Sequence, residues 1–341
     1  MSQAVRGLTP GYFALVMGSG IISVGLHLRG FTTPSTLLLL VALTAFAVLL
    51  VLTVVRIIRF PDAVADDFSD ARRAFGFLTF IAGANVVGVR LAMDGHYTVT
   101  AVMLGVAGLT WLILGYVVPW TAVLSTQARP VVARANGTWF IWVVASQSIA
   151  VAAATIEPIY TSARNGLAVV AVFSWSVGVF LYGAAGIFVS LRMMLYELRP
   201  QDLNPPYWVA MGACAITVLA GARIVEMLDA PMVAATRGLI GGLSVVFWAF
   251  ATWLIAPLIA AGWWRHRTHR VPLTYEATLW SVVFPLGMYA VAGIYLGQAD
   301  ELPLVGHIGS AALWVAFAVW AGTFVAMVIH VTRTVLLPGA R

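Results

Sequence analysis

Polar side chains that interrupt the apolar segments of this chain are its first candidates for chemistry. Asn85, Ser146, Gln147 and Ser148 lie in the middle of long apolar runs, where each can offer hydrogen-bond donors. Weak, distributed donors suit the passage of a partly dehydrated anion, because a tight cationic site in a low-dielectric medium would trap the ion. We therefore expect Asn85, Ser146 and Gln147 to line a pore. Hydrogen bonding between packed helices is the alternative role for these groups.

Two arginines near the ends of apolar segments, Arg90 and Arg223, are candidates for attracting anions. We expect them to line an outer vestibule, where their charge raises the local anion concentration. The alternative is that both side chains extend to the membrane interface. Arg223 has a further alternative, an ion pair with Glu226 three residues later on the same helix face.

An aromatic residue directly before a proline, Phe284 before Pro285, lies within another apolar segment. Proline removes a backbone hydrogen bond and bends a helix, which leaves carbonyl groups that a water-filled passage can satisfy. An aromatic ring beside such a bend can swing between a blocking and an open position. We therefore predict a pore gate at Phe284 and Pro285. A core aromatic beside a kink is the alternative.

Signals of enzyme chemistry are weak. The six histidines form no pair at the spacing of metal or haem ligands, and Cys214 is the only cysteine. Asp62, Asp66, Asp67 and Asp70 resemble the aspartates with which membrane prenyltransferases hold Mg²⁺. No second aspartate-rich loop completes such a site, and aspartates also suit a helix N-terminus. We expect no enzyme, no metal and no cofactor, with prenyl transfer as a distant alternative.

The composition identifies the medium in which these groups lie. The 341 residues are 61% hydrophobic and only 9% charged, whereas a soluble domain carries about 25% charged residues. Crossing ~30 Å of hydrocarbon takes about 20 apolar residues as a helix, and lipid forces helices because each backbone polar group must be satisfied internally. Ten segments qualify: 10–28, 35–58, 75–93, 98–118, 138–155, 166–194, 207–228, 235–260, 277–297 and 303–330. The first lacks a clean cleavage site, so we expect a retained span and not a signal peptide.

The basic residues predict how the chain is oriented. All 19 are arginine, and 14 of them lie on the side of the N-terminus: Arg6, Arg56, Arg59, Arg72, Arg73, Arg129, Arg134, Arg192, Arg199, Arg265, Arg267, Arg270, Arg333 and Arg341. The positive-inside rule then predicts a multi-pass protein of the inner (plasma) membrane with both termini in the cytoplasm. The net charge of +6 thus reflects topology, and we expect no nucleic-acid partner.

The segments repeat in pairs. They form five helical hairpins that start near residues 10, 75, 138, 207 and 277, within a single transmembrane domain that spans residues 1–341. The first helix of each hairpin is rich in small residues. We expect five glycines from these helices to line a central pore: Gly18, Gly20, Gly83, Gly212 and Gly287. Close helix packing is the alternative role for these glycines. We predict that the odd helices form an inner ring and that the even helices face lipid.

Three motifs resemble those of the tellurite-resistance/dicarboxylate transporter family, which includes TehA-type channels, guard-cell slow anion channels, malate permeases and sulfite efflux proteins. The motifs are Thr9-Pro10-Gly11-Tyr12-Phe13-Ala14 with Met17-Gly18-Ser19-Gly20, then Asn136-Gly137-Thr138-Trp139-Phe140 through Ser146-Gln147-Ser148, and Trp280-Ser281-Val282-Val283-Phe284-Pro285-Leu286-Gly287-Met288-Tyr289. The last motif is more similar to the malate and sulfite branch than to the guard-cell channels.

The resemblance implies an all-α membrane fold with ten helices, arranged as five hairpins in pseudo-fivefold symmetry around a central pore. It also implies a homotrimer with one pore per subunit and a ninth-helix phenylalanine, here Phe284, that closes the pore. The expected partners are small inorganic or organic anions and the lipid bilayer. We expect channel-like conduction of small anions. A proton-coupled carrier for C4-dicarboxylates such as malate and a sulfite or tellurite efflux protein are the alternatives.

Overall fold

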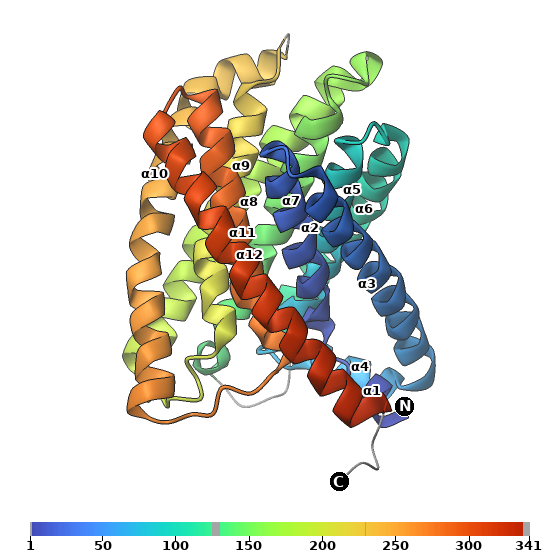
Figure 1. The fold of residues 1–341 in the computed structure, drawn as a ribbon, viewed down its shortest axis with the longest axis vertical. Helices are drawn as coiled ribbons and strands as arrows, with labels where there is room; N and C mark the ends of the chain where they lie inside the picture. The colour runs from blue at the N-terminus through green and yellow to red at the C-terminus, as the bar shows by residue number, and fades with distance from the viewer. Residues whose placement is uncertain (1, 125–129, 229, 337–341) are drawn as a thin grey trace.

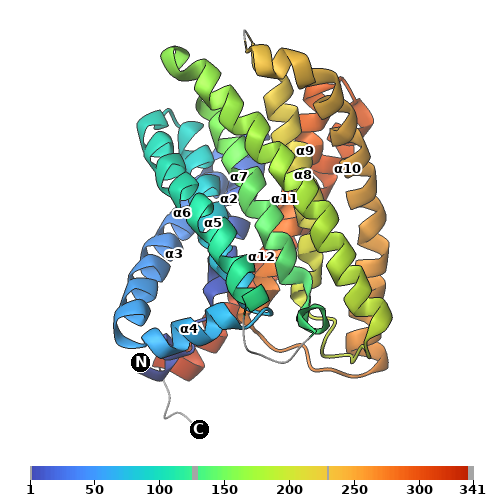
Figure 2. The ribbon, with the colours of Figure 1, turned by 180° about the vertical axis from the view of Figure 1, so that it is seen from behind.

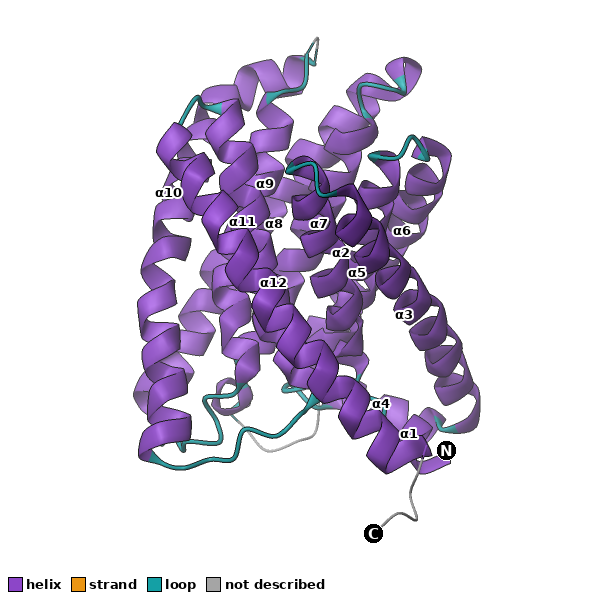
Figure 3. Cartoon of the chain, in the orientation of Figure 1, coloured by secondary structure: helices purple, strands orange, loops and turns teal. Residues whose placement is uncertain are grey.

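Helices make up nearly the whole protein (Figure 1, Figure 3). The computed structural model describes residues 2–124, 130–228 and 230–336, so Arg129 and Arg341 from the count above lie outside the described residues. The described part contains ten helices that are long and apolar enough to cross a membrane. This confirms the predicted all-α membrane fold and the number of spans.

The spans alternate between short and long helices. The short helices are α2 (Ala14–Leu28), α5 (Thr79–Ala92), α7 (Ile141–Ile156), α9 (Val209–Val225) and α11 (Trp280–Ala299). The long helices are α3 (Thr32–Arg59), α6 (Tyr97–Leu124), α8 (Arg164–Leu195), α10 (Pro231–Trp263) and α12 (Pro303–Val331). Each long helix packs against the short helix that precedes it, so the spans form five hairpins.

The short helices form a closed ring at the centre of the bundle. Each packs against the next short helix along the chain, and α11 packs against α2. Between 72% and 83% of the residues in the most apolar part of each short span are buried, but only 11% to 33% in the long spans. The inner position of the odd helices is thereby confirmed, and the long helices surround them (Figure 2). Pseudo-fivefold symmetry stays a prediction.

All five inner helices run in the same direction from one face of the bundle. Each begins with a short 3₁₀ turn: η1 (Pro10–Phe13), η2 (Ala74–Leu78), η4 (Gly137–Phe140), η6 (Pro205–Trp208) and η8 (Ala277–Leu279). These turns lie on the face that also holds α1 (Ser2–Arg6) and the end of α12, at the bottom of Figure 1. We call it the lower face and the opposite one the upper face. The positive ends of five helix dipoles therefore point to the lower face.

One connection differs from expectation. Residues 59–74 are expected as a loop, but they contain α4 (Pro61–Ser69), a helix that lies along the lower face and packs against α3 and α6. Proline at its first position and Asp62 in its first turn both favour a helix start. The helix is too short and too polar to be found in a search for membrane spans.

Candidate functional site

A small cavity of about 20 Å³ lies inside the ring, and all five inner helices contribute to its lining. Its polar lining residues are Asn85, Ser148, Thr155, Arg223 and Tyr295, and the other lining residues are apolar. Because these residues come from the second half of each inner helix, the cavity occupies the half of the ring nearest the upper face. We call it the upper cavity.

Two polar side chains form a pair in the wall of the upper cavity. The Asn85 amide nitrogen Nδ2 donates to Ser148 Oγ at 3.0 Å, and both residues are at most 2% exposed. The Ser148 hydroxyl in turn donates to the carbonyl oxygen of Ala145 at 2.7 Å. An amide nitrogen carries two protons, and within the described part of the chain only one proton of Asn85 has a partner. The second proton has no partner among the described residues, and neither has the buried Oδ1 oxygen of the same amide.

Ser146 and Gln147, which are expected to line the pore, point away from the axis. Ser146 Oγ accepts a hydrogen bond from Trp111 Nε1 of α6 at 2.9 Å, and Gln147 Nε2 donates to the carbonyl oxygen of Trp175 in α8 at 3.1 Å. Successive residues of a helix are about 100° apart, so three in a row cannot all face one axis. Ser148 is the one that lines the upper cavity.

Arg223 lies in the lining of the upper cavity. Its guanidinium forms an ion pair with Glu226 at 2.5 Å and lies over the ring of Tyr295 at 5.3 Å from the centroid. The ion pair with Glu226 is therefore present, and the same side chain also lines the upper cavity. Its role in attracting anions stays a prediction. Glu226 cancels much of the charge that Arg223 presents to an approaching anion.

Arg90 has a different position, between α2, α3 and α5, and does not belong to the cavity lining. It is 1% exposed, pairs with Asp94 at 2.8 Å and donates from Nε to the hydroxyls of Ser23 and Ser35 at 3.0 and 3.1 Å. These contacts hold three helices together. The structure thus separates the two arginines expected in one vestibule.

The glycines expected to line the pore lie where two inner helices meet, and none of them belongs to the lining of an axial cavity: Gly18, Gly20, Gly83, Gly212 and Gly287. A Cβ at Gly212 would lie 2.8 Å from Cγ of Pro285, and one at Gly20 would lie 2.7 Å from Cγ1 of Val86. Such distances leave no space for a larger residue. Close packing, the alternative for small residues in membrane helices, accounts for these positions.

A second axial cavity of about 340 Å³ opens at the lower face. Its lining comes from the first turns of all five inner helices and the segments before them: Thr9, Gly11, Arg72, Arg73, Gly76, Asn136, Thr138, Ile141, Asn204, Pro206, Ala277, Thr278 and Ser281. We call it the lower cavity. Sequence analysis missed it because its polar residues come from five distant segments, outside the regular part of each span.

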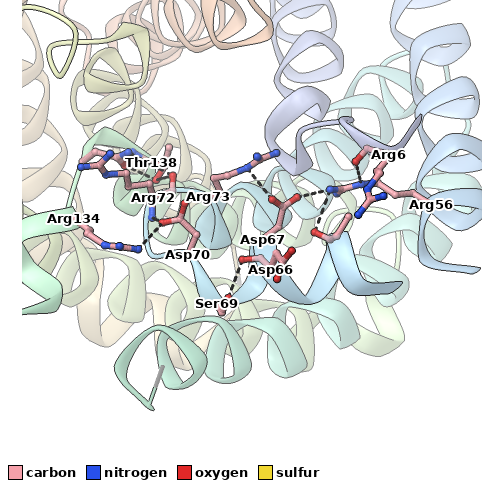
Figure 4. A network of polar contacts seen from close by, with 12 residues as sticks. Arg6, Arg56, Asp66, Asp67, Ser69, Asp70, Arg72, Arg73, Arg134 and Thr138 are labelled. Carbon is pink, nitrogen blue, oxygen red and sulfur yellow. Dashed lines mark hydrogen bonds and ion pairs between the residues drawn. The ribbon is translucent and has the colours of Figure 1, made fainter. Parts of the chain in front are cut away.

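The two arginines of the lower cavity differ in their partners. Arg73 Nε lies 2.8 Å from Oδ1 of Asp67, whose Oδ2 lies 2.7 Å from Nη2 of Arg56 (Figure 4). Arg56 and Asp67 are almost fully buried, with side chains 5% exposed. No ion pair of the Arg72 guanidinium is found within the described residues, while its carbonyl oxygen accepts from Thr138 Oγ1 at 3.2 Å. Arg72 therefore presents its full charge to the lower cavity.

Phe284 lies between the two cavities. Ser281, three residues before it, lines the lower cavity, and Met288, four residues after it, lines the upper cavity. The two residues next to Phe284 on α11 show which way its side chain points. Val283 faces Gly18 of α2, and Pro285 faces Gly212 of α9. Because α2 and α9 flank α11 in the ring, the side chain between these two directions points to the ring axis. Phe284 is 1% exposed.

Small residues surround the level of Phe284 on the other inner helices. Gly18, Ala82, Ala145 and Ala213 each lie three residues before a residue that lines the upper cavity, hence about one turn below it. All four are buried. About one turn below the upper-cavity lining, four of the inner helices therefore carry glycine or alanine, and α11 carries Phe284.

Three of the four aspartates that suggested a Mg²⁺ site are engaged otherwise. Asp62 pairs with Arg6 at 2.7 Å, Asp67 pairs with Arg56 and Arg73, and Asp70 Oδ1 accepts from the backbone nitrogen of Arg72 at 3.0 Å. Within the described ranges, no group of three or more His, Cys, Asp or Glu side chains could hold a metal ion.

Comparison with known proteins gives one family and several relatives. The family model described as "Voltage-dependent anion channel" (SLAC1) matches residues 7–328. An uncharacterized membrane protein of Mycobacterium tuberculosis is 65% identical over 156 residues, which cover 46% of this chain and 79% of the relative. Two uncharacterized transporters of Methanocaldococcus jannaschii are 25% identical over 328 residues (94% of this chain and 92% of the relative) and 23% identical over 332 residues (95% of each).

Proposed function

Since this chain belongs to the voltage-dependent anion channel family, we propose that it conducts small anions through the ring of its five inner helices and that Phe284 closes the path. Family membership agrees with the resemblance inferred from the sequence motifs. The observation that carries the proposal is the pair of axial cavities, which are lined by all five inner helices and separated at the level of Phe284. An unpaired Arg72 below that level and the Asn85 donor above it suit an anion.

The finer assignments are part of the same proposal. The arginine distribution supports a cytoplasmic lower face in the plasma membrane, and the family resemblance supports a homotrimer. The guanidinium of Arg72 can bind a planar carboxylate or other oxyanion through two parallel hydrogen bonds. A carrier for C4-dicarboxylates such as malate is therefore the second candidate.

Reconstitution into liposomes tests this function. Chloride, nitrate, sulfite and malate are supplied in turn, and flux and current are recorded. A channel gives currents that reverse at the equilibrium potential of the anion, whereas a carrier shows saturation and coupling to protons. Absence of flux for the whole panel, in protein that is folded and correctly inserted, contradicts the proposal.

Replacing Arg72 with glutamine is expected to reduce anion flux from the lower face. The unpaired charge raises the anion concentration in the lower cavity, so we expect a loss of about tenfold at low ionic strength and little loss at high salt, where the charge is screened. Arg73→Gln is the comparison variant and should lose less flux, because the Arg73 guanidinium is ion-paired with Asp67, which it shares with Arg56. An equal loss in both variants, or a loss that does not change with salt, contradicts the role of Arg72.

At the upper cavity, Glu226→Gln and Arg223→Gln are expected to have opposite effects. Removing the carboxylate frees the charge of Arg223 and raises flux from the upper face, whereas removing the guanidinium lowers it. Because Arg223 is partly exposed, each effect should be about threefold at low ionic strength. Flux measured with anions supplied from that side checks this. A change of the same sign in both variants is incompatible with an electrostatic role.

A further inference from the structure

A third space lies away from the ring axis, between the fourth and fifth hairpins at the lower face. It has a volume of about 420 Å³, and η6, α10, α11 and α12 contribute to its lining. Figure 1 shows α10 and α12 diverging toward the lower face, with the chain between α10 and α11 crossing below the gap. We call this space the crevice.

The wall of the crevice within the membrane is apolar and built largely from small residues. Leu258, Ala261 and Gly262 contribute from α10, and Gly322 and Ala326 contribute from α12. No atom lies within 4 Å of the position that a Cβ would take at Gly262 or at Gly322. The wall therefore borders open space, of a kind that a hydrocarbon chain can fill.

The end of the crevice at the lower face is cationic. Arg265 is 9% exposed, and its Nη1 donates to the carbonyl oxygens of Gln201 and Leu203, both at 3.1 Å. Its Nε is buried and has no partner within the described residues. Nη2 of Arg265 forms an ion pair with Oε1 of Glu276 at 3.7 Å, and the Glu276 side chain is half exposed, so this pair is partly screened by water. His266 lies beside Arg265 in the same lining.

The hydroxyl of Tyr275, at the same end, adds no negative charge. It bonds to the hydroxyl of Tyr12 at 2.8 Å and accepts from Trp280 Nε1 at 3.1 Å. Burial raises the pKa of Tyr275 well above its usual range, so the phenol stays neutral. The crevice thus has an apolar interior and a basic end at the lower face.

We propose that the crevice binds one phospholipid with an anionic headgroup, whose acyl chain lies between α10 and α12 and whose phosphate is held at Arg265. Charge complementarity favours this occupant. The segment around Arg265 also carries Arg267 and Arg270, and basic residues at a membrane surface attract acidic lipids. A guanidinium is well suited to a phosphate. The bound acyl chain would contact Leu279 of η8 and Val282 of α11, the helix that carries Phe284.

Native mass spectrometry of the full chain in mild detergent tests the acyl-chain contact, with phosphatidylglycerol and phosphatidylcholine as probes. Gly262→Leu and Gly322→Leu fill the crevice without meeting protein atoms, and leucine suits a helix better than glycine. We expect each to reduce retention of phosphatidylglycerol about tenfold. Gly242→Leu is the matched control, because Gly242 is equally open and on α10 but does not line the crevice.

A second pair of variants tests the headgroup. Arg265→Gln is expected to remove the preference for phosphatidylglycerol over phosphatidylcholine, while Arg267→Gln keeps it, because Arg267 is exposed and does not line the crevice. If Arg265→Gln does not fold, the glycine variants decide alone. Unchanged lipid retention in Gly322→Leu overturns the proposal. A changed oligomeric mass in Gly322→Leu with lipid retention intact also overturns it, since the crevice would then be covered by a second copy of the chain.

Discussion

Phe284→Ala is expected to raise anion flux through the reconstituted protein by about tenfold or more, which corresponds to a barrier lower by at least ~1.4 kcal/mol. The ring lies between the two axial cavities, at a level where the other inner helices carry glycine or alanine. Truncation to a methyl group would join the cavities into one path that water can enter. A narrow apolar constriction excludes ions because it excludes water, so removing it lowers the cost of passage.

The matched control is Phe13→Ala. Phe13 is also a buried phenylalanine at the start of an inner helix, but it packs edge-on against Phe46 and Phe80, at centroid distances of 5.8 and 5.5 Å. Its truncation should cost stability, about 3–5 kcal/mol for a buried phenylalanine, without raising the flux per folded protein. Flux in Phe284→Ala that stays at or below the wild-type value, in protein that remains monodisperse, would show that Phe284 is not the barrier.

Asp67→Asn is expected to cause a large loss of stability, about 3–5 kcal/mol, because it leaves a buried arginine without a counter-charge. Asp67 binds Arg56 and Arg73 at the same time, and through them α4 is joined to α3 and to the residue that precedes η2 (Figure 4). Unfolding in mixed detergent micelles, followed by circular dichroism, measures the loss. Since Arg73 also loses its partner, flux from the lower face at low salt should rise in the fraction that stays folded.

Asp62→Asn is the control for this second prediction. Asp62 also belongs to α4 and pairs with an arginine, but both side chains of the Arg6–Asp62 pair are more than half exposed. Exposed ion pairs contribute about 0–1 kcal/mol, so Asp62→Asn should be close to wild type. In the double variant Arg56→Met, Asp67→Asn, the uncompensated charge is gone and part of the stability should return. Equal losses in Asp67→Asn and Asp62→Asn would contradict the importance of burial.

Much of the candidate site could not be predicted from the sequence, for a geometric reason. In the sequence, three consecutive polar residues in one apolar run are indistinguishable: Ser146, Gln147 and Ser148. Only the rotation of α7 about its own axis, set by its packing against neighbouring helices, decides that Ser148 faces the ring axis. Arg90 and Arg223 occupy similar places in their spans. Arg90 contacts Asp94 and two serines and so lies between α2, α3 and α5, whereas Arg223 lines the upper cavity.

The sequence by itself determined the membrane class, the ten spans, their pairing in hairpins and the inner position of the small-residue helices. These features are local, because each helix satisfies its own backbone within lipid and its residue sizes decide whether it packs or faces acyl chains. Only the tertiary structure decided which side chains meet. Within the described residues Asp67 pairs with Arg73 while no ion pair of the Arg72 guanidinium is found, and the first turns of five distant helices converge around both arginines. These contacts between residues far apart in the sequence form only when the five inner helices close into a ring, so the pattern of a single segment does not predict them.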